Sequence, residues 1–193
     1  MPQTTRPELT KEEITQTAVT LQRSRPAYGA LIEFYSQVFL AQAQSRTHLA
    51  LDPIIIDPTL LALKQENGMP LIDPSQFLID RSQADTLLKK LCDLAVAHAP
   101  KLANTGEKIS TALKNDKLEL EPIFSALLNN QDLEETAVLL DIALDELTFF
   151  IFSAMAPSIQ SCAVQLAAYL KDTPPLKKGY CPVCGSHPDV AFL

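Results

Sequence analysis

The segment Thr148–Leu170 has the sequence TFFIFSAMAPSIQSCAVQLAAYL and contains no charged residue. Because about 20 apolar residues span a bilayer, its length is compatible with a membrane helix. Pro157 lies near its middle, and polar residues recur along it: Ser153, Ser158, Gln160, Ser161 and Gln165. Polar side chains are costly in lipid. We therefore interpret the segment as the buried central helix of a soluble protein, with no stable membrane insertion.

Helix signals precede this segment along the chain. Thr10 with Glu13, and Asp132 with Glu135, have the spacing of capping boxes, in which two side chains satisfy the first backbone N–H groups of a helix. The second box predicts an amphipathic helix that continues without a break into the apolar segment. Asp57 also precedes a short helix-forming stretch. These signals predict an all-α multi-helix bundle, with a helical domain over residues 1–171.

Apolar spacing predicts the inner faces of two further helices. The first runs to about Leu49, and its expected inner face consists of Tyr28, Leu31, Ile32, Tyr35 and Phe39. The second begins after Asp80, and its expected inner face consists of Ala84, Leu87, Leu88, Leu91 and Ala95. Between them, the stretch from Met69 to Pro74 is expected to be an extended connector packed on the surface.

Charge and composition narrow the function classes. The 193 residues carry a net charge of −7, and the pI is about 4.9. An acidic chain repels phosphate backbones, so nucleic acid is not an expected partner. The amino-terminal residues 1–25 contain no apolar core of a secretory signal. We therefore expect a cytoplasmic protein, in which free thiols and metal thiolates persist.

The pattern that most clearly carries chemistry is Cys181-Pro182-Val183-Cys184-Gly185, which follows a Pro-rich linker at 172–179. Two intervening residues let both sulfur atoms reach one metal ion, but a closed tetrahedral site needs four ligands. His187 is a candidate third ligand. A thioredoxin-type redox pair is the other interpretation, although that motif normally begins a helix in a βαβ unit.

The remaining candidates are expected to be structural. Cys92 and Cys162 lie among apolar residues, which is typical of small core side chains. His48 and His98 fall near predicted helix ends and are expected to be caps or surface residues. Three carboxylates, Glu134, Asp141 and Asp145, share one face of the predicted helix and are expected to be solvated; an acidic surface for a basic partner is the alternative. The sequence contains no Gly-rich phosphate loop and no His-Glu-x-x-His motif.

The order of these features resembles the formate dehydrogenase accessory protein family, the E-type formation protein. The segment Tyr180-Cys-Pro-Val-Cys-Gly-Ser186 looks like that family's first metal knuckle. The early helical stretch Leu31–Gln44, the connector Pro70-Leu-Ile-Asp73 and the apolar helix before the linker add to the resemblance.

The resemblance implies a cytoplasmic maturation factor without turnover of its own. Such a protein binds the catalytic subunit of a formate dehydrogenase and is needed for its activity. Family members follow their helical domain with a rubredoxin-like, iron-binding region of several Cys-x-x-Cys motifs. Here only Cys181 and Cys184 match, so residues 172–193 are expected to be the linker and the first half of that region. Iron or zinc would bind there in a full-length protein, and incompletely or not at all in this chain.

Two other functions fit the same residues. One is a general helical chaperone for redox metalloenzymes, in which the knuckle is purely structural. The other is a thiol- or persulfide-handling enzyme that uses Cys181 or Cys184. We also expect the helical part to fold without metal, with the segment after Gly179 poorly ordered or dependent on contacts from a neighbouring chain.

Overall fold

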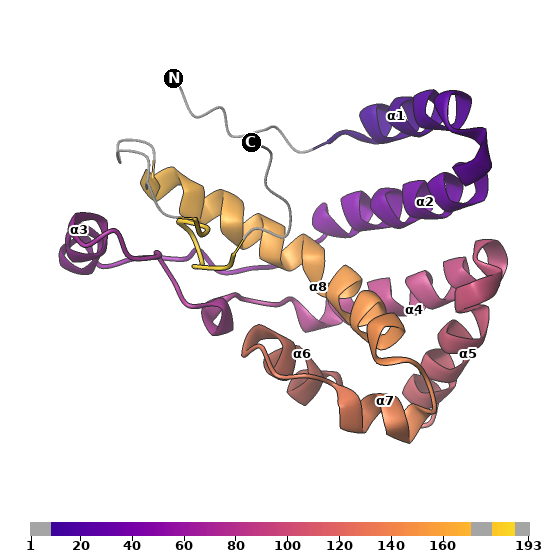
Figure 1. The fold of residues 1–193 in the computed structure, drawn as a ribbon. Helices are drawn as coiled ribbons and strands as arrows, with labels where there is room; N and C mark the ends of the chain where they lie inside the picture. The colour runs from indigo at the N-terminus through magenta and orange to yellow at the C-terminus, as the bar shows by residue number, and fades with distance from the viewer. Residues whose placement is uncertain (1–8, 171–178, 188–193) are drawn as a thin grey trace.

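The computed structural model describes residues 9–170 and 179–187 (Figure 1). Within those ranges the chain forms eight α-helices and no strand, which confirms the all-α class. The helices are α1 Lys11–Ser24, α2 Gly29–Arg46, α3 Pro58–Glu66, α4 Arg81–His98, α5 Pro100–Lys114, α6 Leu120–Leu128, α7 Glu134–Leu140 and α8 Leu144–Ala167. The 3₁₀ helices are η1 Pro26–Tyr28, η2 Pro74–Gln76 and η3 Ala168–Leu170. Apart from Gly179, the predicted linker lies outside the described residues.

Side-chain caps begin three helices where the sequence predicts them. Thr10 accepts a hydrogen bond from the Glu13 N–H at 3.1 Å, and the Glu13 carboxylate accepts one from the Thr10 N–H at 2.7 Å. The Asp57 carboxylate caps α3 by accepting from the N–H groups of Thr59 and Leu60. The Asp80 carboxylate caps α4 by accepting from the Gln83 N–H. Each cap satisfies backbone N–H groups that have no partner inside the helix.

Helix α8 lies at the centre of the fold and contacts α2, α4, α5, α6 and α7 (Figure 1). Phe150, Ile151 and Met155 on α8 are fully buried. The segment Leu144–Leu170 is long and apolar enough to cross a membrane, but half of its most apolar window is buried inside the protein. Its position in the core is the one expected for a central helix; the absence of membrane insertion stays a prediction.

Pro157 removes one hydrogen bond from the interior of α8. Proline has no N–H, so the carbonyl of Ser153, four residues earlier, loses its intrahelical donor. The side chain of Gln42, on α2, donates to this carbonyl instead, with Nε2 and O 2.9 Å apart. Gln42 and Ser153 are both buried. A polar side chain in the α2–α8 contact thus compensates for a proline inside the central helix.

The predicted inner face of α2 is wrong. Phe34, Val38 and Ala41 are buried, whereas four of the residues expected inside are exposed: Tyr28, Leu31, Tyr35 and Phe39. Helix α2 packs against α1, α4 and α8, and these neighbours cover the side that carries several small or polar residues. Small side chains allow helices to approach closely. The buried side of α2 is therefore the one that faces α1, α4 and α8, and not the one with the largest apolar side chains. Tyr35 instead packs edge-on against Phe149 of α8, with ring centroids 5.9 Å apart.

The prediction of one continuous helix from Asp132 into α8 is also wrong. Asp141 adopts a left-handed conformation (φ 52°) and separates α7 from α8. Its carboxylate pairs with Lys108 of α5, with Nζ and Oδ2 2.7 Å apart. At the start of α7, Asp132 accepts from the Glu134 N–H, and the residue at the cap position is Leu133. The short α7 can therefore turn and pack on α5 before α8 begins.

A second, smaller apolar cluster lies between the carboxyl-terminal half of α8 and the segments that link α2 to α4. Its buried members are Ile56, Leu71, Ile72, Phe77, Cys162, Leu166 and Val183. Polar groups of α8 and η3 hold the linking segment: Gln165 accepts from the Ile54 N–H at 3.0 Å, and the Tyr169 hydroxyl donates to the Ile54 carbonyl at 3.1 Å. Leu71 and Ile72 are buried, so the connector packs against the helical body through these two side chains, whereas Met69 and Asp73 are exposed.

Candidate functional site

The Cys-x-x-Cys segment forms a closed turn. The N–H of Gly185 donates to the carbonyl of Cys181 at 2.8 Å, and the N–H of Cys181 donates to the carbonyl of Ser186 at 2.8 Å. Gly185 has a φ of +77°, a backbone conformation that favours glycine. The turn therefore presents Cys181 and Cys184 from one small loop. The Gly185 amide closes this loop by donating to a carbonyl oxygen.

This knuckle, residues 180–186, is docked on the connector. The N–H groups of Leu71 and Ile72 donate to the carbonyls of Pro182 and Val183, at 3.1 and 2.9 Å. Val183 is buried in the second apolar cluster. A Cβ atom at position 185 would lie 2.9 Å from Cγ of Pro70, so only glycine fits against the connector. The segment after Gly179 was expected to be poorly ordered or dependent on a neighbour, but residues 180–186 make these contacts within their own chain.

Two apolar patterns in the sequence coincide with this docking. Val183 is an apolar side chain between the two cysteines, and Leu71-Ile72 is an apolar pair in an otherwise Pro-rich connector. Each signal is weak alone, because neither segment has a helical or alternating period. Backbone hydrogen bonds between segments more than 100 residues apart cannot be inferred from either pattern.

The two thiols fit half of a metal site. Cys181 and Cys184 are free and partly buried, and Sγ of Cys184 lies 3.3 Å from the Ser186 hydroxyl. Residues 9–170 and 179–187 contain no group of three or more His, Cys, Asp or Glu side chains placed to hold a metal ion, and His187 is exposed. Cys181 and Cys184 therefore stay two candidate ligands, whereas a closed tetrahedral site needs four. The structure does not bring His187 to them.

The other two cysteines are buried, as expected. Burial, together with the nearby Asp93 carboxylate, raises the pKa of Cys92 to about 12. Burial also raises the pKa of Cys162, whose thiol donates to the Leu78 carbonyl at 3.5 Å. Both thiols stay protonated near neutral pH, which makes them poor nucleophiles and poor metal ligands.

The histidines and the carboxylate face carry no assembled site in the described part of the chain. His48 and His98 are exposed at the carboxyl-terminal ends of α2 and α4. Glu134, Asp141 and Asp145 are exposed, as expected. They do not share one helical face, because the left-handed Asp141 interrupts the helix on which that face was predicted.

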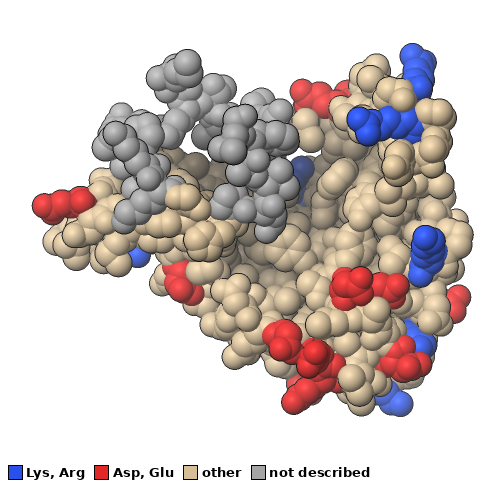
Figure 2. Space-filling model, viewed as in Figure 1, with Lys and Arg blue, Asp and Glu red and all other residues tan. Residues whose placement is uncertain are grey.

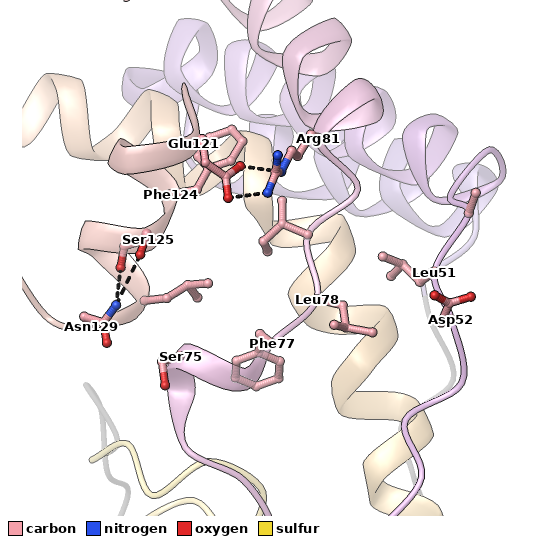
Figure 3. A pocket seen from close by; sticks show the side chains of 13 residues that line it. Leu51, Asp52, Ser75, Phe77, Leu78, Arg81, Glu121, Phe124, Ser125 and Asn129 are labelled. Atoms are coloured by element: carbon pink, nitrogen blue, oxygen red, sulfur yellow. Dashed lines mark hydrogen bonds and ion pairs between the residues drawn. The ribbon is translucent and has the colours of Figure 1, made fainter. Parts of the chain in front are cut away.

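A concave site of about 380 Å³ lies between one side of α6 and the segment that leads into the start of α4 (Figure 3). Phe77, Leu78 and Phe124 supply much of its apolar wall. Arg81 and Glu121 form an ion pair across it, and the Asn129 side chain donates to the Ser125 carbonyl at 2.8 Å. These interactions join α4 to α6 and hold α6 together beside the pocket. No Cys or His is among the described residues that line it.

Comparison with known proteins adds no assignment: no protein-family model, no curated protein and no solved structure matches the chain.

Proposed function

We propose that this chain is the client-binding part of a maturation factor for the catalytic subunit of a formate dehydrogenase. In this proposal the helical part holds the immature subunit, and the Cys-x-x-Cys knuckle lies beside the bound client. The protein carries out no turnover itself.

One observation supports this proposal more than any other. The knuckle and the connector, two separate segments that carry the family resemblance, are joined by backbone hydrogen bonds at 3.1 and 2.9 Å. A docking protein benefits from this arrangement because a knuckle held on a helical body moves with the surface that binds the client. An independent redox domain on a free linker would not need such contacts.

Cys181 and Cys184 are the residues that would hold a metal ion. Iron or zinc bound there would hold the loop in one conformation. Iron, unlike zinc, would also respond to redox state. A second chain, a client side chain or further residues of a longer protein would supply the other ligands. The knuckle keeps both thiols together through the Gly185 turn, without help from the metal.

Co-purification tests the proposal. The catalytic subunit of a formate dehydrogenase is co-expressed with this chain and recovered through an affinity tag on the subunit. We expect the chain to elute with the subunit in roughly equal amounts, and the isolated chain to show no formate oxidation. Absence of the chain from the eluate, or formate oxidation by the chain alone, would be contrary results.

A matched pair of variants separates the knuckle from the rest of the fold. Val183→Asp places a charge in the second cluster and should release the knuckle, whereas Val164→Asp changes an exposed valine on α8. We expect Val183→Asp to weaken recovery with the subunit and Val164→Asp to leave it unchanged. Recovery of the chain with many unrelated metalloenzymes as well would favour the general chaperone. Rapid sulfur transfer through Cys181 or Cys184 would favour the enzyme.

A further inference from the structure

A large open groove lies between the turn after α5 and helices α6 and α7. Its volume is about 760 Å³. The apolar part of its lining consists of Leu118, Pro122, Ile123, Ala126, Leu133 and Leu139. Leu118, Ile123 and Leu133 are buried at the base of the groove, whereas Leu139 is 73% exposed. The groove thus offers a fixed apolar base and one large apolar side chain that no part of the described chain covers.

The edge of the groove is acidic. Four carboxylates line it, from Asp116, Glu119, Asp132 and Glu135, against the single ammonium of Lys117. None of the four forms an ion pair within residues 9–170 and 179–187. Figure 2 shows acidic side chains gathered over the part of the surface that α6 and α7 form, in the lower part of the view. The groove therefore combines an apolar base with a net negative edge.

We propose that this groove binds a basic amphipathic helix of a partner protein. The apolar side chains of that helix would enter the groove and cover Leu139, and its Lys or Arg side chains would meet the carboxylates at the edge. An amphipathic helix in an apolar groove is a common recognition mode. Complementary charge around such a groove speeds association and selects the partner. Nucleic acid is a poor occupant, because the same carboxylates repel phosphate groups.

The proposal does not depend on the identity of the client. It is also distinct from the carboxylate face expected from the sequence, because only the neighbouring Glu135, and not Glu134, lines the groove. That difference provides matched controls on α7. Glu134 and Glu135 are adjacent exposed glutamates, and Val138 and Leu139 are adjacent exposed apolar residues. In each pair only the second residue lines the groove.

The test uses a fluorescent helix-forming peptide of roughly 14 residues, about four turns, with leucines on one face and lysines on the other. Its affinity for the full chain is measured by fluorescence anisotropy, beside a scrambled peptide of the same composition. We expect the amphipathic peptide to bind more tightly than the scrambled one, and more weakly as salt rises. Glu135→Lys should weaken binding about fivefold by replacing an attraction with a repulsion. Leu139→Ser should weaken it about tenfold by removing apolar contact.

The controls decide the outcome. Glu134→Lys changes the net charge by the same amount as Glu135→Lys, and Val138→Ser removes a similar exposed side chain on the same helix. Equal effects of the two lysine variants would show that binding follows net charge. Equal effects of the two serine variants would show non-specific hydrophobic binding. Either result would overturn the proposal. Equal binding of the scrambled peptide would do the same. If the chain self-associates and Leu139→Ser abolishes this in sedimentation, the groove belongs to a second copy and the proposal is wrong.

Discussion

The hydrogen bond from Gln42 to the Ser153 carbonyl can be tested against the proline that makes it necessary. Gln42→Met keeps the length of the side chain but removes the donor. The carbonyl then stays buried without the partner that replaces the missing N–H of residue 157. An unsatisfied buried acceptor costs about 1–3 kcal/mol. We therefore expect Gln42→Met to lower the free energy of unfolding by about 2 kcal/mol, measured by urea denaturation with circular dichroism at 222 nm.

A double-mutant cycle makes this test specific. Pro157→Ala provides a backbone N–H that can donate to the same carbonyl within α8. In that background Gln42→Met should cost less than about 1 kcal/mol, which leaves a coupling energy of about 1–2 kcal/mol. Gln37→Met on α2 is the control, because the Gln37 amide makes an exposed hydrogen bond to Glu33 and its loss should matter little. If Gln42→Met costs the same in both backgrounds, the proline is not the reason for the buried glutamine.

Three further predictions concern packing, pH and thiol reactivity. Gly106→Ala should lower the free energy of unfolding by about 1–2 kcal/mol, because the added Cβ would lie 2.9 Å from the carbonyl oxygen of Cys92 and force α4 and α5 apart. The raised pKa of Cys92, about 12 against an ordinary 9.0, means that above pH 9 the folded state retains a proton that the unfolded state loses. Stability should therefore be intact below pH 9 and fall as the pH rises toward 12, and Cys92→Ala should flatten that decline in urea melts. A thiol-reactive dye should label Cys181 and Cys184 before the buried cysteines, and Val183→Asp should speed that labelling at least severalfold.

Each of these predictions has a defined contrary result. Gly29→Ala is the control for the packing prediction, since a Cβ there meets nothing within 4 Å. Equal stability losses for the two glycine variants would contradict the close α4–α5 approach. A decline of stability above pH 9 that Cys92→Ala leaves unchanged would assign it to other groups. Equal labelling rates for all four thiols in the native protein would contradict the placement of Cys92 and Cys162 in the core.

Helix positions were largely predictable because their signals are local. Thr10 with Glu13, Asp57 and Asp80 each satisfy N–H groups within three residues, so a cap can be identified without knowing the rest of the fold. The inner stripe of α4, including Leu88 and Leu91, was also predictable, because helices cover it as its spacing indicates.

Features that depend on distant neighbours were not predictable in this way. The exposed stripe of α2 has the same spacing as a buried one, and only the positions of α1, α4 and α8 decide which side is covered. The helix breaks at Asp141, which has a left-handed backbone conformation and forms an ion pair with Lys108 on another helix. For the candidate site, the cysteine spacing identified Cys181 and Cys184, but their attachment to Leu71 and Ile72 is a contact across more than 100 residues.

Client selectivity tests the central claim most directly. The purified chain is immobilised, and its affinity for the metal-free catalytic subunit of a formate dehydrogenase is measured by biolayer interferometry. The comparison protein is the metal-free catalytic subunit of an unrelated metalloenzyme of similar size and charge. We expect a dissociation constant in the micromolar range or tighter for the formate dehydrogenase subunit, and affinity at least about 100-fold weaker for the comparison, a difference of about 2.7 kcal/mol. Equal affinity for both subunits, or no binding to the formate dehydrogenase subunit, would contradict the account.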